Sequence, residues 1–238
     1  MQVTGNNIQN NSKSIRFSTG GLSFCVNGKC KSVSFEQTDN NFHKTMAICL
    51  CEDFFKESNT DIWNIQIDNP YFSIIPKEIG NKDICISAFK LNFPDIASNH
   101  IIMAEDIDRH NMTCTFAVHK GLYNFIKTHF PLHRIHHYSI NGIIKSIEHS
   151  KTNGSREVWA CAENNSLLIN LVENGKLLLT NSFNIKTATD CLYFIGSIYE
   201  QFDLSKKNIP LFFYGNKSYL NLLEKHISHC NNIPTLCE

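Results

Sequence analysis

Four histidines within nine residues form the densest group of side chains that could bind a metal ion: His129, His133, His136 and His137. A metal site needs ligands that converge from rigid elements. Pro131 separates His129 from His133, and adjacent His136 and His137 point to opposite faces if residues 134–138 form a strand. We therefore expect no metal site here, and we interpret these histidines as partly exposed strand and loop residues.

Ten cysteines could supply disulfides or a zinc site, and their surroundings favour neither. Most lie in apolar, strand-like runs such as SFCV, DICISAF, MTCTF and VWACA, where a free cysteine behaves as a small buried apolar residue. No Cys-x-x-Cys pair occurs, and the spacing of Cys49 and Cys51 does not suit a zinc knuckle. We expect reduced core thiols in a cytoplasmic protein. His226, His229 and Cys230 have the spacing typical of the edge of a terminal helix.

Charge and hydropathy exclude several classes of protein. The 238 residues include 22 Lys and Arg against 22 Asp and Glu, so the chain lacks the positive excess that binding to phosphate backbones requires. The N-terminal MQVTGNNIQNNSKS lacks the apolar segment of a signal peptide, and no window approaches the roughly 18 apolar residues of a membrane span. We expect no nucleic-acid partner and no membrane insertion. P-loop, dinucleotide-binding and nucleophile-elbow motifs are absent as well.

The elements that position any site begin with an antiparallel meander. We expect strands over 14–19, 22–26 and 30–35, because Asn27-Gly28 suits the tight type I′ turn of a hairpin. The apolar patterns that follow predict helices over 42–55, 83–93, 120–130 and 140–149. They also predict strands over 62–67, 71–75, 100–105, 112–118 and 133–138.

The second half repeats this order after a polar stretch, Ser150 to Ser155, that we interpret as a linker. Strands are expected over 158–162, 166–172, 176–183, 209–214 and 234–237, and helices over 187–202 and 219–227. Asn174-Gly175 forms the second hairpin turn of this type.

A supersecondary unit that occurs twice in the same order is strong evidence of architecture. Each copy extends a three-stranded meander by further strands through helical crossovers, which predicts a mixed α/β sheet of the ribonuclease H type. Two such sheets in tandem make the actin-like ATPase architecture. We divide the chain into a disordered polar tail over 1–13, a first subdomain with an insertion over 14–152, and a shorter second subdomain over 153–238.

The sequence from Asn165 to Leu204, NSLLINLVENGKLLLTNSFNIKTATDCLYFIGSIYEQFDL, followed by IPLFFYG, resembles an uncharacterised, Bacteroidetes-type family with a ribonuclease H-like, actin-like ATPase fold. The runs SIRFSTGGLSFCV, YFSIIPKEI and AVHKGLYNFIKTHFPLHRIHHYS of the first half agree with that resemblance. More remotely, the pattern is similar to the actin-like protein of type IV pilus assembly, a cytoplasmic scaffold. The resemblance implies a cleft between two subdomains and no particular activity.

It also implies where a nucleotide would bind, because an actin-like ATPase holds Mg²⁺ near an acid on each first strand and wraps the phosphates with glycine-rich turns. The first such turn contains Thr19, Gly20 and Gly21 but no acid. The second contains Glu163, Asn164 and Asn165, where Asn165 replaces a glycine and would crowd a phosphate. Gly215 matches the glycine that passes under an adenosine.

The missing acids argue against ATP hydrolysis and against a two-metal nuclease. We therefore expect no catalytic residues and no cofactor, and a non-catalytic actin-like scaffold or adaptor that binds a protein partner. Three apolar residues are expected to flank the cleft: Phe212, Phe213 and Tyr219. The alternative is a nucleotide-binding switch that uses ATP and Mg²⁺ with weak or no hydrolysis.

Overall fold

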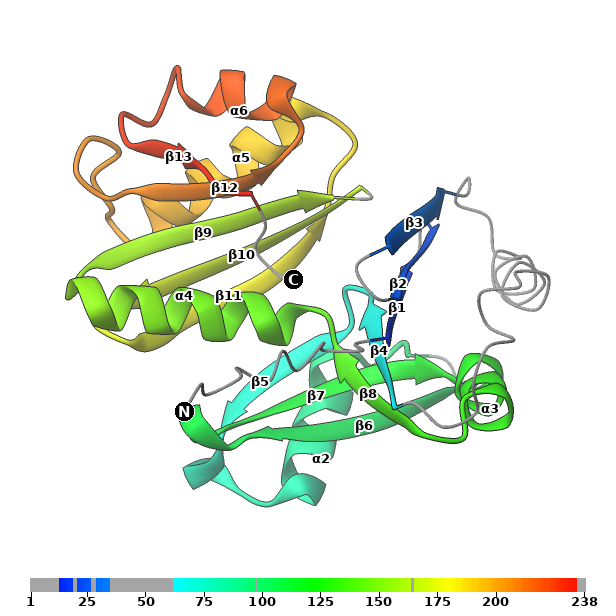
Figure 1. Cartoon of the computed structure of the whole chain (residues 1–238). Helices are drawn as coiled ribbons and strands as arrows, with labels where there is room; N and C mark the ends of the chain where they lie inside the picture. Colours follow the sequence, from blue (N-terminus) through cyan, green and yellow to red (C-terminus); the bar gives the residue numbers. More distant parts are fainter. Residues whose placement is uncertain are drawn as a thin grey trace, which may run out of the picture. The chain divides into compact units, whose positions relative to one another are not determined.

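The computed structural model describes residues 13–18, 21–26, 29–34, 62–96, 98–163 and 165–234, and the chain divides into two compact units (Figure 1). The first unit comprises residues 1–67 and 118–136, and the second comprises 68–117 and 137–238. The predicted helix over 42–55, the first Asn-Gly turn and the polar tail up to residue 12 lie outside the described residues.

The first unit contains the predicted meander at one side of a five-stranded sheet. Antiparallel β1 (Lys13–Ser18), β2 (Gly21–Val26) and β3 (Lys29–Ser34) continue into β4 (Trp63–Asp68) and β8 (His133–His137), in the order β3-β2-β1-β4-β8. Alternate residues of β1 and β4, among them Ile15, Phe17, Ile65 and Ile67, are buried, as the period of a strand with one covered face requires. Helix α3 (Lys120–His129) precedes β8.

The second unit contains the other five-stranded sheet, in the order β11-β10-β9-β12-β13. Its strands are β9 (Arg156–Glu163), β10 (Ser166–Glu173), β11 (Lys176–Asn184), β12 (Leu211–Gly215) and β13 (Cys230–Asn232). Asn174 and Gly175, with φ of 49° and 79°, form the predicted turn between β10 and β11. If the five strands of each sheet are numbered along the chain, both sheets have the spatial order third, second, first, fourth, fifth. This shared order confirms the predicted repeat.

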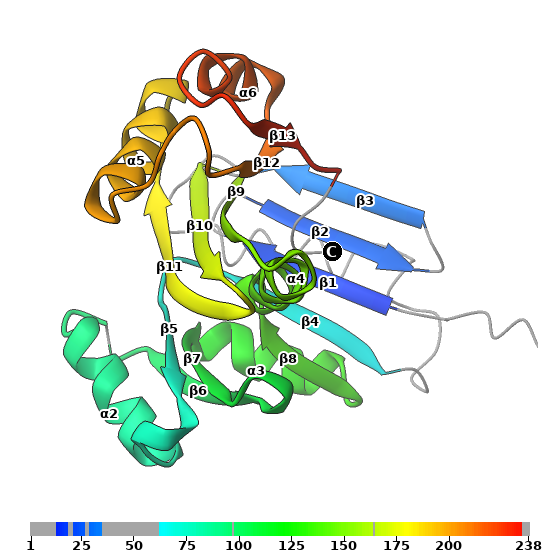
Figure 2. The same ribbon diagram turned by 90° about the vertical axis from the view of Figure 1, so that its left-hand side faces the viewer.

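Helices cover both faces of this second sheet (Figure 2). Helix α4 (Ser139–Asn153) lies along one face, while α5 (Ala188–Gln201) and α6 (Lys217–Leu223) cover the other. Thr187 and Asp190 form a capping box that starts α5. The apolar core of this sheet, which includes Ala160, Ile169 and Phe213, lies under α5.

A smaller, three-stranded sheet is formed by the residues between β4 and α3 in the chain, and which residues make up the predicted insertion stays a prediction. It has the order β5-β7-β6, with β5 (Phe72–Pro76), β6 (His100–Ile107) and β7 (Met112–His119). Helix α2 (Lys82–Asn92) packs on it through Cys85 and Phe89. Short 3-10 turns precede α2 at Lys77–Ile79 and connect β6 to β7 at Asp108–His110.

One predicted boundary is wrong. Ser150 to Asn153 are not a linker but the last turn of α4, which ends at Gly154 in the left-handed conformation (φ 60°). Ser150 is fully buried, and its hydroxyl donates to the carbonyl of Ser155, so these polar residues stabilise the helix end. The sequence did not predict the strand Cys230–Asn232, which pairs in parallel with the first three residues of β12, and residues 235–237 of the predicted strand over 234–237 lie outside the described residues. The domain division at residues 152 and 153 stays a prediction.

No helix in the described ranges has the length and apolarity needed to cross a membrane.

Candidate functional site

Three of the predicted site residues lie together at one end of the second sheet. Glu163 is the last residue of β9, and Asn165 belongs to the turn that leads into β10. Gly215 ends β12, and its register partner on β9 is Ala162, next to Glu163. The parallel pairing of β9 and β12 therefore brings the predicted acid and the predicted glycine to one edge, as proteins with ligand sites at strand ends do.

Gly215 is required by the packing of its own strand. Its φ is 155°, which side chains other than glycine rarely adopt. A Cβ at this position would lie 2.8 Å from the carbonyl oxygen of Ala162 and 2.9 Å from the ring of Phe213. The backbone conformation and the close approach to β9 explain this glycine without a ligand.

Asn165 takes over the conformational role of a glycine in the β9–β10 turn. Its φ is 61°, in the left-handed region where asparagine is the commonest residue after glycine. Its carbonyl accepts a hydrogen bond from the backbone N–H of Ile185 at 2.9 Å. The turn therefore has a backbone that a glycine would also adopt, although a side chain is attached to it.

Glu163 is held by neighbouring protein groups. The hydroxyl of Tyr138, the residue before α4, donates to its carboxylate at 2.8 Å, and the Cys161 thiol lies 3.9 Å from the same oxygen. Tyr138 is buried. One oxygen of the only acid in the predicted turn is thus engaged in fastening α4 to β9.

The first predicted turn lies in the other unit and is described in part. Gly21 is the first residue of β2 and pairs with Ser18, whose hydroxyl donates to the Gly21 carbonyl at 2.9 Å. The six residues of β1 include no acid. Thr19, Gly20 and Asn164 lie outside the described residues.

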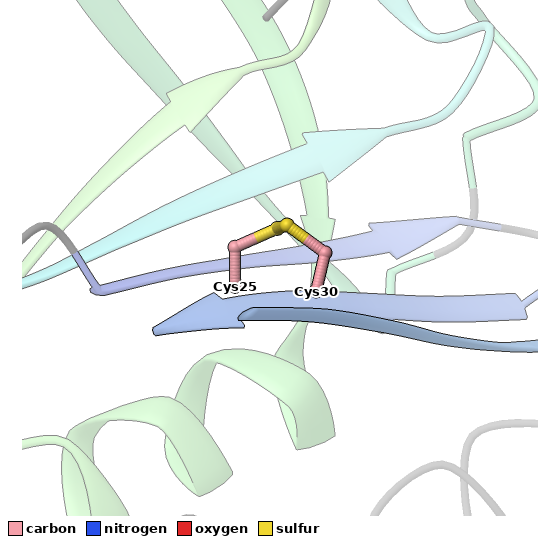
Figure 3. Close-up of a disulfide and its surroundings, with 2 residues drawn as sticks. All are labelled: Cys25 and Cys30. Atoms are coloured by element: carbon pink, nitrogen blue, oxygen red, sulfur yellow. A yellow bond between two sulfur atoms is a disulfide. The ribbon is translucent and has the colours of Figure 1, made fainter. Parts of the chain in front are cut away.

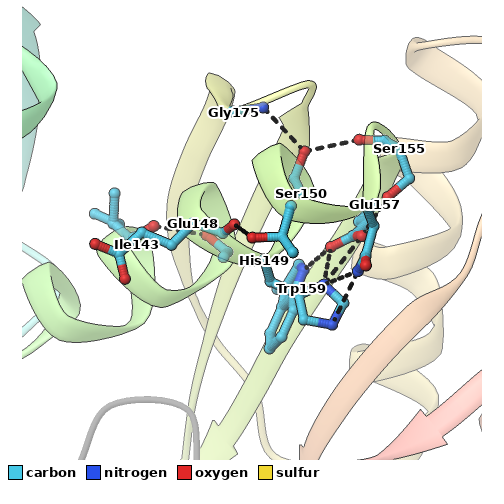
Figure 4. Close-up of polar contacts among 11 residues, drawn as sticks. Ile143, Glu148, His149, Ser150, Ser155, Glu157, Trp159 and Gly175 are labelled. Carbon is cyan, nitrogen blue, oxygen red and sulfur yellow. Dashed lines mark hydrogen bonds and ion pairs between the residues drawn. The ribbon is translucent and has the colours of Figure 1, made fainter.

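A buried polar cluster that the sequence analysis missed surrounds Glu157, which is 1% exposed (Figure 4). The carboxylate accepts hydrogen bonds from Nδ1 of His149 at 2.9 Å, from Nε1 of Trp159 at 2.8 Å and from the hydroxyl of Ser155 at 2.5 Å. The ring of Trp159 stacks on Phe212, with centroids 4.4 Å apart. The alternation Ser155-x-Glu157-x-Trp159 was a signal, because it places these three side chains on one face of the strand.

The groove beside this cluster runs along α4. It has a volume of about 600 Å³ and is lined by residues of the helix alone: Asn141, Ile144, Lys145, Glu148, His149, Thr152 and Asn153. His149 lies between the groove and Glu157, and its ring makes edge contacts with Trp159 and Phe212. Within the described part of the chain no three His, Cys, Asp or Glu side chains are grouped to hold a metal ion.

His137 corrects our interpretation of the histidine group, because it is fully enclosed rather than partly exposed. Its Nε2 lies 3.0 Å from the carbonyl of Asn69, and its Nδ1 lies 2.7 Å from the hydroxyl of Ser139. The ring stacks on Phe72. Burial lowers the pKa of His137 to about 4, and the hydrogen bond to Asn69 opposes that shift. A neutral ring here donates Nε2–H to Asn69.

The cysteines follow the expectation only in part. Cys85, Cys114, Cys161 and Cys191 are buried free thiols, and burial raises the pKa of Cys191 to about 12. Cys25 and Cys30, however, form a disulfide between β2 and β3 (Figure 3), so the expectation of reduced thiols is wrong for this pair. They are direct register partners. A two-residue turn at Asn27-Gly28 places residue 25 opposite residue 30, so the predicted hairpin contained the signal for this register. Cys49, Cys51 and Cys237 lie outside the described residues.

The three aromatic residues expected at a cleft have structural roles. Phe213 is completely buried in the apolar core under α5, Tyr219 packs against that core, and Phe212 stacks on Trp159. Phe213 therefore cannot contact a partner protein, because an alternate residue of a central strand faces the covering helices.

Comparisons with known proteins agree with this architecture. A family model described as a protein of unknown function (DUF3822) matches residues 2–230. A Bacteroides thetaiotaomicron protein with an actin-like ATPase fold and unknown function aligns with a TM-score of 0.85 at 22% identity, over 100% of this chain and 96% of that chain. A chain of a PilM-PilN type IV pilus biogenesis complex aligns with a TM-score of 0.59 at 8% identity, over 94% of this chain and 88% of that chain. No curated protein matches the sequence. The likeness shows the predicted fold, an actin-like ATPase fold of mixed α/β sheets.

Proposed function

Because the chain belongs to the DUF3822 family, whose function is unknown, we propose its role from its own geometry: it is a non-catalytic, actin-like scaffold that binds another protein. The proposal concerns two properties, the lack of nucleotide turnover and the presence of a surface for a partner. Each has its own support and its own experiment.

The hydrogen bond between Tyr138 and Glu163 carries the first property. An acid that orients Mg²⁺ and its waters needs free oxygens at the phosphate. Glu163 is instead bonded to Tyr138 at 2.8 Å, and the first turn has no acid on β1 to complement it. The backbone conformation of Gly215 and its close approach to β9 account for a glycine at this position without a nucleotide. These contacts support the interpretation that the residues at the expected nucleotide site instead hold α4 against β9.

The second property is supported by the outer edge of the second sheet. β11 has nine residues and stands at the end of the strand order, with no strand on its outer side among the described residues. Leu178 on β11 is 41% exposed, and Tyr193 on α5 is 67% exposed. On the same strand, Phe183 of β11 stacks on Phe194 of α5, with centroids 4.4 Å apart. An extended segment of a partner can add to such an edge and place apolar side chains on these rings.

The likeness to a chain of the PilM-PilN complex agrees with this role, because that structure is a complex of proteins. The partner of this chain is proposed by chemistry only: a segment that forms a β-strand with apolar residues on one face.

A thermal-shift titration of the whole protein with ATP and with ADP, each with and without Mg²⁺, tests the first property. Nucleotide at about 5 mM is a hundredfold above a Kd of about 50 μM and would stabilise the protein by about 2.7 kcal/mol, so binding of that strength or tighter would be visible. We expect no shift. A shift that requires Mg²⁺ and is lost in Glu163→Ala would replace the proposal by the nucleotide-switch alternative.

Differential capture from a native extract tests the second property. Wild type and Leu178→Asp are used as baits, and Leu132→Asp, at a leucine of the first unit that is 47% exposed, is the matched control. We expect at least one protein to be retained by wild type and by Leu132→Asp but not by Leu178→Asp. Identical sets for all three baits would refute the assignment of the β11 edge.

A further inference from the structure

Helix α2 has two apolar sides, and only one of them is covered. Cys85 and Phe89 are completely buried against the three-stranded sheet. Ile84 and Leu91 are 48% and 82% exposed, and Ala88 lies between them. The spacing i, i+4, i+7 places these three residues on one side of the helix. Single exposed apolar residues are normal, but an exposed stripe at helical spacing indicates an interaction surface.

The stripe extends toward the start of the helix. Ile79, in the 3-10 turn before α2, is 63% exposed. Gly80 follows it, and the side chain of Ile84 lies directly over Gly80, since a Cβ there would come within 2.6 Å of Ile84 Cδ1. In the middle of the stripe the side chains are small. Ser87 and Ala88 allow close approach of a second helix, and the Ser87 hydroxyl already donates to the Asp83 carbonyl.

The stripe is complementary to itself. If two α2 helices pair antiparallel with their two-fold axis between Ser87 and Ala88, Ile84 of each copy lies opposite Leu91 of the other. A two-fold pair of this kind also keeps residues of one flank on the same flank in both copies. The helical period places Asp83 and Lys90 on one common flank of the stripe, so Asp83 of each copy comes beside Lys90 of the other.

The charges needed for that pairing are available. Within the described ranges neither Asp83 nor Lys90 has an ion-pair partner. The other lysines nearby are engaged, Lys77 with Asp106 and Asp108 and Lys82 with Asp106 at 3.4 Å. Antiparallel helices also align the negative end of one dipole with the positive end of the other.

We propose that α2 is a self-association surface on which a second copy of this chain docks as an antiparallel helix pair, with Ile84 against Leu91 and Asp83 against Lys90. This inference is independent of the proposed function. Each copy contributes one helix of 11 residues, a small contact beside the roughly 800 Å² per partner of a standard interface, so we expect association at concentrations on the order of 100 μM.

Sedimentation equilibrium of the whole protein over about 10 to 500 μM, at about 50 mM salt, tests the proposal. Wild type should show an average mass that rises with concentration, and Leu91→Asp should stay monomeric. Leu132→Asp, which places the same charge on a leucine of the first unit that is 47% exposed, is the control and should associate like wild type. A mass that does not change with concentration, or association that Leu132→Asp abolishes and Leu91→Asp does not, overturns the proposal.

Two charge reversals distinguish this geometry from nonspecific apolar contact. Asp83→Lys alone and Lys90→Asp alone each create two repulsive pairs in a homodimer and should weaken association at least tenfold. An equimolar mixture of the two variants creates two attractive pairs in a heterodimer and should associate at least as strongly as wild type. Circular dichroism of each variant confirms folding. Failure of the mixture to regain association, with both variants folded, would contradict the antiparallel pairing.

Discussion

The hydroxyl of Tyr138 donates a hydrogen bond to the carboxylate of Glu163 at 2.8 Å and joins the residue before α4 to the last residue of β9. At the other end of the same helix and strand, His149 donates to Glu157. Both glutamates lie on the face of β9 that α4 covers, six positions apart, and the helix contributes residues eleven positions apart. Because a strand rises about 3.3 Å and a helix about 1.5 Å per residue, these spacings correspond to similar lengths.

Tyr138→Phe removes only the hydroxyl from this contact. We expect it to lower the free energy of unfolding by about 1 to 3 kcal/mol, the range for hydrogen bonds to charged groups. Urea denaturation measures the change. Tyr193→Phe removes the same hydroxyl from a side chain that is 67% exposed and serves as the control, with an expected change within about 0.5 kcal/mol. Equal effects of the two substitutions would show that Glu163 is not fastened through Tyr138.

Glu157→Gln keeps the size of a buried side chain and replaces one acceptor oxygen by an amide N–H₂ group. That group faces the donors of His149, Trp159 and Ser155, so at least one buried donor loses its acceptor. We expect a loss of about 2 to 4 kcal/mol in the free energy of unfolding. Glu200→Gln, on the exposed end of α5, should leave the urea midpoint unchanged.

Gly215→Ala tests whether this glycine is required by packing. The new Cβ meets backbone at 2.8 Å in a conformation that alanine rarely adopts, so we expect a loss of more than about 2 kcal/mol without any ligand present. Gly196→Ala in α5 is the matched control. A Cβ there has no atom within 4 Å, and helix propensity predicts a gain of about 0.5 to 1 kcal/mol. Opposite signs in thermal or urea denaturation are the expected result.

Because His137 is buried, we expect the free energy of unfolding to decrease in mild acid. Its pKa is lowered to about 4 in the folded chain, against about 6.5 in the unfolded chain, so the unfolded state takes up the proton first as the pH falls. Stability is therefore fully present above pH 6.5 and declines between about 6.5 and 4, by roughly 3 kcal/mol in total. Urea midpoints measured across this range should fall less steeply in His137→Gln. Parallel slopes for the two proteins would contradict the prediction.

The disulfide between Cys25 and Cys30 should be detectable in the native protein and should disappear on reduction. Peptide mapping without reductant should recover these two cysteines joined, while buried Cys85, Cys114, Cys161 and Cys191 resist alkylation until the protein unfolds. The closed loop is short, so Cys25→Ser with Cys30→Ser should lose about 2 kcal/mol at most. Two freely alkylated cysteines in the native, oxidised protein would show that the link does not form.

The sequence by itself determined the properties that depend on neighbouring residues. Alternation and helical spacing placed most strands and helices, and Asn174-Gly175 marked its hairpin because such turns need two residues that tolerate positive φ. The repeated order then predicted the two sheets and the fold, and the residues of β1 already lacked an acid.

Tertiary structure alone decided which distant side chains meet. Tyr138 and Glu163 are 25 positions apart, and Asn69 and His137 are 68 positions apart, so no local pattern links them. The polar end of α4 looked like a linker because its burial comes from the sheet beneath it. Local conformation is encoded in consecutive residues, whereas the partner of a buried polar group depends on how whole elements pack.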